Sequence, residues 1–348
     1  MRIAYILTAL RDLSSVHVAL DQVNAMMQHG HACKVFYFKE IKEVVFPCPT
    51  EKISLFKSIP FNQFDIIHTH CFRPDLYAFL HKPFFGKKPY FVNTIHSYLY
   101  PDYRNSMGFF KGSIIAFLEL LFMRRIDKNV CMSNTAVEYY SRYLCKEHLT
   151  YSYNTKVIDN TQSISDHDKF TLLEFKSKHI HVCGSICVVS PIKGLDQVIK
   201  ALPALPRFGF VIIGDGPSVV ELKQLASDLH VDDQVLFLGF RKDGYRFIPY
   251  LDIFCMPSHS EGCPVAMLEA AAMGKPIVTT DIPIFKELLS STECVQFQEN
   301  DIEDCAKAIE KAVLQSAKLG ANAKAKFDSH FSFESFYRRY LSIYKRDC

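Results

Sequence analysis

The sequence predicts an α/β protein made of two doubly wound, Rossmann-like domains with parallel sheets. Short apolar runs suited to buried strands alternate with segments of helical spacing along the chain. The length of 348 residues is enough for two domains that each bury a core. A polar segment at 159–169 with few apolar residues separates two such series and is typical of a linker.

The first series starts with an apolar run that suits a strand buried on both faces, followed by a helical pattern that ends at Gly30, a residue that commonly ends helices. The later strands are apolar runs of four to six residues, and the helices between them show apolar residues at helical spacing. The expected strands are 2–8, 34–38, 64–68, 90–95 and 128–131, and the expected helices are 16–28, 74–80 and 110–125.

The second series repeats this alternation without repeating the sequence. Its expected strands are 181–189, 210–213, 235–238, 253–256 and 276–279, and its expected helices are 196–202, 219–229, 265–273, 302–319 and 333–344. In doubly wound sheets, ligands bind outside the carboxyl ends of the strands, so we expect the functional residues in the loops that follow the strands.

Composition excludes several classes of protein. The apolar content of 49% and the charged content of 22% are typical of folded globular proteins, and a net charge of +3 is too small to indicate nucleic-acid binding. The longest apolar helical segment, 114–123, contains Glu119 and is too short to span a bilayer. The twelve cysteines form no CxxC pair and no signal peptide is evident, so we expect free thiols in a reducing cytoplasm.

The segment 257–270 is the most informative for chemistry. A predicted strand ends near Met256, a turn containing Ser and Gly follows, and Pro264 can take the first position of a helix. The unpaired backbone N–H groups of such a helix start suit a phosphate. Glu261 and Glu269 bracket this point, which suits the hydroxyl groups of a sugar nucleotide. The alternative is that Glu261 caps the helix and Glu269 is an exposed charge.

Other motifs occur in an order that points to one family. They are Ser-Pro-Ile-Lys-Gly at 190–194, Gly-Asp-Gly-Pro at 214–217, Val-Leu-Phe-Leu-Gly at 235–239, the Glu261/Glu269 pair, Gly-Lys-Pro-Ile-Val at 274–278 and Glu287. Together they resemble the retaining GT-B glycosyltransferases of family GT4. The resemblance implies a GT-B fold with an acceptor-binding domain at 1–165, a nucleotide-sugar-binding domain at 166–330, a central cleft, and a last helix at 331–348 that packs back on the first domain.

The resemblance also implies an activity. The chain would transfer a hexose from a nucleotide donor, with UDP favoured, to a hydroxyl acceptor with retention at the anomeric carbon. The implied catalytic residues are His96 at the transferred sugar, Lys193 at the leaving diphosphate and Glu261 at the sugar hydroxyls. Glu269 would hold the ribose. The other implied contacts are Gly214, Gly216, Arg241, Gly262 and Val265 for the donor, and Ser14 and Ser15 for the acceptor.

Two positions depart from the family pattern. The family commonly has an arginine five residues before the lysine of the Lys-Gly loop, where this chain has Val188. One of two cations on the diphosphate is therefore missing, which would weaken donor binding by about 1 kcal/mol or more unless another group compensates. The first loop has Leu13-Ser14-Ser15 where a Gly-Gly pair is usual. Serine is small and can cap the helix, but the backbone approaches a ligand less closely.

No cofactor and no metal are expected. His68 and His70 are two residues apart, so on a strand both point to one face, but no third ligand is evident and we favour a structural role for them. No Asp-x-Asp motif follows a strand. The retaining GT-B enzymes that the chain resembles need no metal, and the nucleotide sugar is a substrate.

Charge suggests where the acceptor binds. Residues 1–165 hold 19 Lys and Arg against 13 Asp and Glu, a net +6, and the remainder holds 21 against 24, a net −3. Lys87-Lys88, Lys111 and Arg124-Arg125 flank the aromatic segment 109–126, which is either an ordinary core helix or a helix lying on an anionic membrane. In the second case the acceptor would be a lipid-linked glycan at the inner face of the plasma membrane, in surface-polysaccharide or lipopolysaccharide biosynthesis.

Other enzymes built from two α/β domains also bind nucleotides. A nicotinamide-dependent enzyme would need a complete Gly-x-Gly-x-x-Gly turn, which the chain lacks. A nucleotide-sugar epimerase of the same two-domain architecture remains the alternative, because it also binds a nucleotide. The sequence does not identify the donor base, the sugar or the acceptor.

Overall fold

The computed structural model describes residues 1–86, 88–159, 161 and 163–347 and divides the chain into two compact units. Unit 1 comprises Met1–Thr155 together with Phe333–Cys348, and unit 2 comprises Lys156–Ser332. The last helix therefore belongs to the first unit. The sequence placed the boundary at 165/166, whereas the structure assigns 156–165 to unit 2. Lys87, counted above with the basic residues of unit 1, lies outside the described residues.

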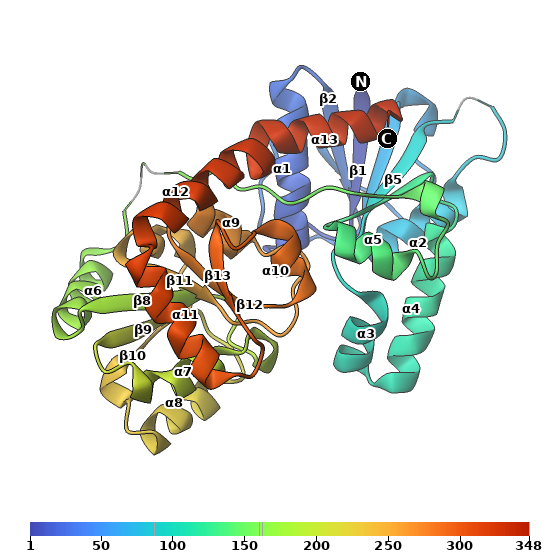
Figure 1. The fold of residues 1–348 in the computed structure, drawn as a ribbon. Coiled ribbons are helices and arrows are strands. Elements are labelled where there is room, and N and C mark those ends of the chain that lie inside the picture. Colours follow the sequence, from blue (N-terminus) through green and yellow to red (C-terminus); the bar gives the residue numbers. More distant parts are fainter. Residues whose placement is uncertain (87, 160, 162, 348) are drawn as a thin grey trace. The chain divides into compact units, whose positions relative to one another are not determined.

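Unit 1 is built on a parallel sheet with the strand order β3-β2-β1-β4-β5-β6-β7 (Figure 1). The strands are β1 (Arg2–Leu7), β2 (Ala32–Tyr37), β3 (Thr50–Lys52), β4 (Ile66–His70), β5 (Tyr90–Thr94), β6 (Lys128–Cys131) and β7 (Leu149–Tyr151). The helices are α1 (Ser14–Gln28), α2 (Phe72–His81), α3 (Leu99–Met107), α4 (Phe109–Met123), α5 (Asn134–Tyr140) and α13 (Phe333–Lys345).

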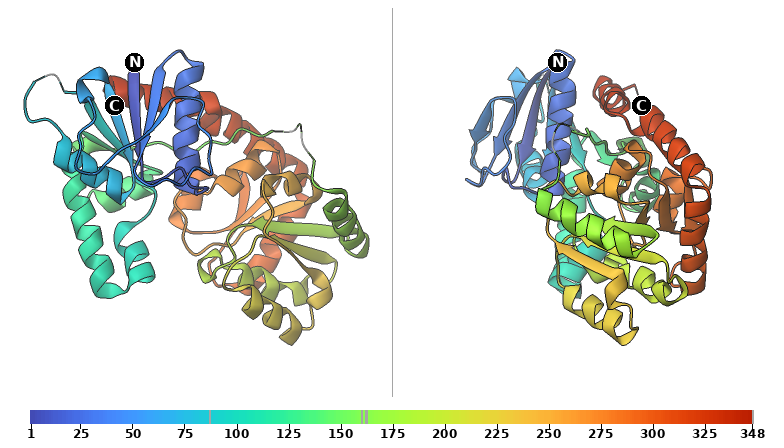
Figure 2. Two further views of the ribbon diagram at one scale, coloured as in Figure 1. Left: turned by 180° about the vertical axis from the view of Figure 1, so that it is seen from behind. Right: turned by 90° about the vertical axis from the view of Figure 1, so that its left-hand side faces the viewer.

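Strand β1 explains why this sheet needs cover on both faces. Its alternate residues point to opposite faces, and all from Ile3 to Leu7 are buried. Tyr5 packs in a cluster with residues of α1 and α13, while Ile6 packs on the other face with Tyr77 of α2. Figure 2 shows α1 and α13 on the same side of the unit 1 sheet. An apolar run of this kind is typical of a parallel sheet covered by helices.

Unit 2 has a parallel sheet with the order β10-β9-β8-β11-β12-β13. The strands are β8 (His181–Ile186), β9 (Phe208–Ile213), β10 (Val235–Gly239), β11 (Ile253–Met256), β12 (Ile277–Thr280) and β13 (Cys294–Phe297). The helices are α6 (Asp166–Lys178), α7 (Leu195–Ala201), α8 (Val219–Asp228), α9 (Val265–Ala272), α10 (Pro283–Leu288), α11 (Ile302–Leu314) and α12 (Ser316–Lys326).

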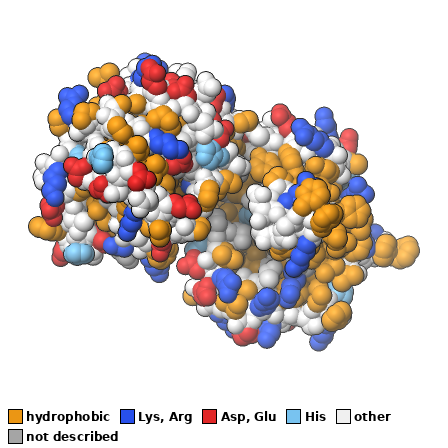
Figure 3. Space-filling view, turned by 90° about the horizontal axis from the view of Figure 1, so that it is seen from below, with side chains coloured by type: hydrophobic (Ala, Val, Ile, Leu, Met, Phe, Trp, Pro, Cys, Tyr) orange, Lys and Arg blue, Asp and Glu red, His pale blue; other side chains and the backbone are white. Residues whose placement is uncertain are grey.

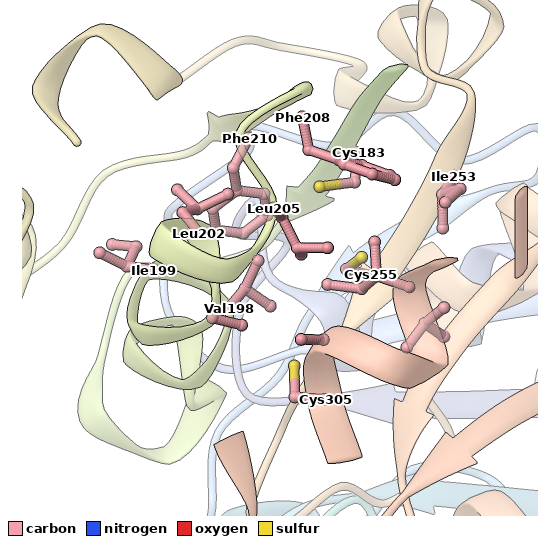
Figure 4. Close-up of a cluster of buried hydrophobic side chains, with 14 of the residues drawn as sticks. Cys183, Val198, Ile199, Leu202, Leu205, Phe208, Phe210, Ile253, Cys255 and Cys305 are labelled. Carbon is pink, nitrogen blue, oxygen red and sulfur yellow. The ribbon is translucent and has the colours of Figure 1, made fainter. Parts of the chain in front are cut away.

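The core of unit 2 contains buried thiols. Cys183, Cys255 and Cys305 lie among the apolar side chains of β8, β9, β11, α7 and α11, including Val198 and Phe210 (Figure 4). Burial raises the pKa of the Cys305 thiol, so it remains neutral and packs as a small apolar group. None of the eleven cysteines within the described ranges forms a disulfide.

Several expected bounds differ from the structure, among them the strand expected at 181–189, which ends at Ile186. The strand expected at 64–68 is β4 at Ile66–His70, which places both His68 and His70 within the strand. The helix expected at 302–319 is divided into α11 and α12 at Gln315, whose ψ of 15° is not helical. The linker expected at 159–169 ends earlier in the structure, because α6 begins at Asp166. Ser165 caps this helix by accepting a hydrogen bond from the Asp168 N–H at 3.1 Å.

Within the described part of the chain, no helix is both long enough and apolar enough to cross a membrane.

Two carboxyl groups, those of Asp75 in α2 and Glu119 in α4, are buried. Asp75 accepts hydrogen bonds from Thr69 Oγ1 at 2.5 Å and Asn93 Nδ2 at 3.2 Å, and Glu119 accepts one from the Tyr103 hydroxyl at 2.6 Å. Burial raises the pKa of Asp75 to about 7. Burial, followed by the charge of Asp75, raises the pKa of Glu119 to about 8. Both groups therefore bind protons more tightly in the folded state.

The free energy of unfolding should consequently fall as the pH rises. A carboxyl with a raised folded-state pKa contributes stability that is complete below its unfolded pKa, near 4, and lost as the pH passes the folded value. We predict that Glu119→Gln loses less stability than the wild type between pH 5.5 and 8.5, by on the order of 2 kcal/mol in urea denaturation. Glu138→Gln, at an exposed position, should follow the wild type. Parallel profiles for all three proteins would contradict the assignment.

Candidate active site

Two loops of unit 2 meet at the carboxyl ends of β8 and β11. Gly194, with φ +59°, lies so close to the Pro257 carbonyl that a Cβ at this position would collide with it. Gln197 Nε2 donates to the same carbonyl at 2.8 Å, and the His259 N–H donates to the Ile192 carbonyl at 2.9 Å. These backbone contacts hold the Lys-Gly loop against the loop that precedes α9.

This contact brings Lys193 to Glu261. Lys193 Nζ donates to Glu261 Oε1 at 2.6 Å, and Ser258 Oγ donates to the same oxygen at 2.8 Å. The Glu261 side chain is 9% exposed and that of Lys193 is 23% exposed. The pair is therefore a partly desolvated cation and carboxylate with one face open, 68 residues apart in sequence.

Glu269 has a different cation as its partner. It lies within α9 and is only 6% exposed. The alternative expectation, that Glu269 is an exposed charge on the helix, is therefore wrong. Lys156 Nζ lies 3.2 Å from Glu269 Oε1 and 5.0 Å from the centre of the Tyr245 ring. Burial raises the pKa of Glu269, although the Lys156 charge opposes this shift.

The start of α9 differs in one detail from the expectation. Val265 is its first residue and Pro264, at the cap position with ψ 115°, precedes the helix and does not begin it. No side chain caps this end, so Glu261 is not a cap. Gly262 lies in the turn between Glu261 and the helix, and both Gly262 and Val265 are partly exposed. An uncapped helix start between two acidic side chains provides backbone N–H groups for an anion.

The Gly-Asp-Gly loop after β9 packs against the end of β8. A Cβ on Gly214 would collide with the Cys187 carbonyl, and one on Gly216 with the Val189 carbonyl. The Val189 N–H donates to the Asp215 carbonyl at 2.9 Å, which ties the two loops together. Val188, where the family commonly has arginine, is 67% exposed. An apolar side chain thus takes an open position beside this loop.

Arg241 is already paired in the structure. Its Nε and Nη2 atoms donate to Asp168 Oδ1 at 3.1 and 2.9 Å, and its Nη1 donates to the Phe240 carbonyl at 3.1 Å. The arginine therefore anchors the strand end to the first turn of α6. The sequence predicts contact with the base through the backbone near Phe240 and Arg241, and the Phe240 ring is exposed.

A cavity of about 510 Å³ lies on the α7 and α8 side of the Lys-Gly loop. Its lining includes Ser190, Asp196, Glu221 and His259. It contains none of the donor-binding residues expected from the sequence, and the His259 Nδ1 atom is occupied by Glu299 Oε1 at 2.5 Å. We therefore place the candidate donor site at Lys193, Glu261 and the start of α9.

Unit 1 holds the remaining expected residues. His96 lies two residues beyond β5 and is half-buried, with its Nε2 atom 2.9 Å from His70 Nδ1. Ser14 and Ser15 begin α1, and Ser15 lines a cavity of about 300 Å³ at the ends of β1 and β4. His70 lies at the same cavity. Leu13 at the cap position makes no side-chain hydrogen bond, so neither serine caps α1.

The structure brings some expected residues together and adds others. In unit 2, Lys193 meets Glu261 directly, whereas Arg241 is turned to Asp168. Lys156 was missed because a lone lysine near a linker carries no local pattern, and its partner lies 113 residues later. Gln197 was missed because an amide that supports two loops has no signature in the sequence.

Two family models match the chain. The model described as "Glycosyl transferases group 1" matches residues 177–326, and the model described as "Glycosyltransferase Family 4" matches residues 16–155. Together these ranges include most of both units. The chain belongs to glycosyltransferase family 4.

This glycosyltransferase is similar to curated relatives and to solved structures. It is 27% identical to the O-antigen biosynthesis glycosyltransferase WclY of Escherichia coli over 350 residues, which cover 99% of this chain and 98% of the relative. It is 25% identical to the E. coli UDP-Gal:alpha-D-GlcNAc-diphosphoundecaprenol alpha-1,3-galactosyltransferase over 241 residues, which cover 66% and 61%. Anabaena Alr3699/HepE, in complex with UDP-glucose, has a TM-score of 0.78 and 18% identity, covering 99% and 100%, and shares the GT-B fold.

Proposed function

We propose that this family 4 enzyme transfers a hexose from a UDP-sugar to a hydroxyl of a lipid-linked glycan, with retention at the anomeric carbon. The observation that carries the proposal is the Lys193–Glu261 pair beside the uncapped start of α9, with buried Glu269 within that helix. The UDP-glucose in the HepE complex and the UDP-Gal in a relative's name support a UDP donor. The O-antigen and diphosphoundecaprenol relatives support a lipid-linked acceptor in surface-polysaccharide or lipopolysaccharide biosynthesis.

The proposed reaction is a front-face displacement. The bond between the anomeric carbon and the diphosphate oxygen breaks, the acceptor oxygen bonds to the same face of that carbon, and the acceptor proton passes to the leaving phosphate oxygen. Lys193 and the N–H groups at the start of α9 stabilise the charge that develops on the diphosphate. Glu261 accepts hydrogen bonds from the sugar hydroxyls and Glu269 from the ribose, and neither acts as a general base.

The remaining site residues complete the proposal. Gly214 and Gly216 let their loop lie close to the nucleotide, and the backbone near Arg241 contacts the base. His96 contacts the transferred sugar, and Ser14 and Ser15 contribute to the acceptor site with the adjoining cavity of unit 1. Because Val188 supplies no second cation, Lys193 carries more of the diphosphate charge than in relatives with the arginine.

Release of UDP tests the proposal. We expect release from a UDP-hexose only when a lipid-diphosphate-linked sugar is added, and we expect Lys193→Met to lower kcat about 100-fold or more, because it removes the cation beside the leaving group. The matched control is Lys200→Met. Lys200 is exposed in α7, the helix that follows the Lys-Gly loop, and it pairs with Asp196 one turn earlier in the same helix. This variant should keep wild-type turnover.

Two outcomes would contradict this assignment. Conversion of the UDP-hexose into its epimer without net release of UDP would favour the epimerase alternative. Equal turnover in Lys193→Met and Lys200→Met would remove Lys193 from the site.

We also propose that α4 lies on the membrane and places the enzyme at the inner, cytoplasmic face of the plasma membrane. The α4 face, defined as Phe109, Phe110, Ile114, Phe117 and Leu118, is exposed, with Phe110 at 83% and Ile114 at 60%. Residues at spacings of four, seven and eight lie on one side of a helix. In the right-hand part of Figure 3, hydrophobic side chains gather on the surface beside Lys and Arg side chains.

The charges near the α4 face suit an anionic bilayer. Lys111 and Arg124 are exposed on α4 and directly after it, while the acidic residue of the helix, Glu119, is buried. An apolar face with basic borders inserts its aromatic side chains at the interface and attracts anionic headgroups. These features favour a lipid surface over a second protein as the partner.

Vesicle binding tests this contact. We expect the enzyme to sediment with vesicles of phosphatidylglycerol and phosphatidylethanolamine, and Phe110→Ser/Phe117→Ser to bind at least about tenfold more weakly, since each buried aromatic side chain contributes about 1.5–3 kcal/mol. Val45→Ser/Phe56→Ser alters two equally exposed apolar residues elsewhere in unit 1 and should bind like the wild type. Absence of vesicle binding, or a wild-type dimer that this α4 variant dissociates in light scattering, would overturn the assignment.

A further inference from the structure

A continuous series of hydrogen bonds between buried side chains ends at His96. It runs from β1 and α13 through the ends of β4 and β5, all within unit 1. Its members are Tyr5, Tyr344, His68, Thr94, Tyr340, Gln22, His70 and His96. All except His96 are buried. The candidate active-site histidine is thus the partly exposed end of an otherwise buried polar network.

The ring nearest His96 is held firmly in place. His70 stacks on His68 with ring centres 4.8 Å apart and an angle of 18°, and it lies 5.1 Å from the ring of His96 at an angle of 27°. Its Nε2 atom lies 3.1 Å from Gln22 Oε1 and its Nδ1 atom lies 2.9 Å from His96 Nε2. Both nitrogens of His70 are therefore used.

Gln22 determines the direction of these hydrogen bonds. Its Nε2 group donates to Thr94 Oγ1 at 3.2 Å and also interacts with Tyr340, so the amide oxygen faces His70. A carboxamide oxygen only accepts, and therefore the His70 Nε2 atom carries a proton. A neutral imidazole has one N–H, which leaves His70 Nδ1 as an acceptor.

The histidines in this network are neutral near pH 7. Burial lowers the pKa of His68 to about 3 and that of His96 to about 4, and it lowers the pKa of His70 well below its usual value. Since His70 Nδ1 is an acceptor, the bond between the two rings is donated by His96 Nε2–H. The other nitrogen of His96 then bears a lone pair.

We propose that His70 is a positioning residue that holds His96 in its Nε2–H tautomer, so that His96 meets the substrate with Nδ1 as a hydrogen-bond acceptor. That Nδ1 atom makes no hydrogen bond with any residue in the described part of the chain. This inference rests on the proposed function, in which His96 contacts the transferred sugar. The sugar hydroxyl at His96 must then donate a hydrogen bond to Nδ1. This requirement favours donors whose hydroxyl group points toward His96.

The tautomer can be measured directly. In ¹⁵N-histidine-labelled full-length protein, NMR spectra that correlate ring nitrogens with ring protons should show His96 with Nε2 protonated and Nδ1 unprotonated, the signals being assigned with His96→Gln. His70→Phe should shift these signals toward a mixture of tautomers. It should lower kcat about tenfold or more with the donor KM within about twofold, because the ring is no longer oriented. His70→Gln, which can supply an acceptor, should restore part of the loss.

Thr69→Val is the matched control. Thr69 is buried on the same strand between the two histidines, but it points to the other face and donates to Asp75. It should lower stability yet leave the His96 signals and kcat unchanged. A wild-type His96 protonated at Nδ1 would overturn the proposal even if no variant folds, and so would unchanged signals in His70→Phe. If His96→Gln keeps wild-type kcat, the role of His96 in the proposed function fails, while the tautomer measurement still decides the role of His70.

Discussion

The close approach of two loops in unit 2, at Gly194 and Pro257, is the constraint on which the candidate donor site depends. Because residue 194 is a glycine and carries no Cβ, the loop after β8 can lie directly against the loop after β11. This approach brings Lys193 within 2.6 Å of Glu261. Gln197 reinforces it by accepting from the Asn300 N–H at 2.7 Å and donating to Pro257. The charges at the site are therefore positioned by backbone packing.

Electrostatics explains why each carboxylate at this site has its own lysine. A buried or half-buried carboxylate without a cation loses several kcal/mol of solvation. Lys193 stabilises Glu261 and Lys156 stabilises Glu269. In the proposed complex, phosphate oxygens of the UDP-sugar would accept hydrogen bonds from the lysines, and its hydroxyl groups would donate to the carboxylates. The two lysines and two carboxylates would thus exchange one another for the substrate as partners. With Val188 in place of the usual arginine, this exchange depends on few positive charges.

The fold was largely predictable because parallel strands buried on both faces appear in the sequence as uninterrupted apolar runs. Short strands such as β3 and β7 were missed, since three residues give no periodicity. The motifs place Lys193 and Glu261 in loops that follow predicted strands, and this predicted that both lie at the same edge of the sheet. Lys156 and the network behind His96 depend on pairings between distant segments, Gln22 with Thr94 and His68 with Tyr344, which no local pattern records. The pairing of Arg241 with Asp168 was not predictable either, because Asp168 lies in a helix that the sequence assigned in part to a linker.

Retention by front-face attack is the proposed property of this family 4 enzyme on which the assigned roles of Lys193 and Glu261 depend. The anomeric configuration of the product tests it most directly. With an α-linked UDP-hexose and a lipid-diphosphate-linked acceptor, the proton NMR spectrum of the isolated product should show the new linkage in the α configuration from the first turnover. A β-linked product would contradict retention and the assigned roles of Lys193 and Glu261, because an inverting reaction needs a general base on the opposite face of the sugar.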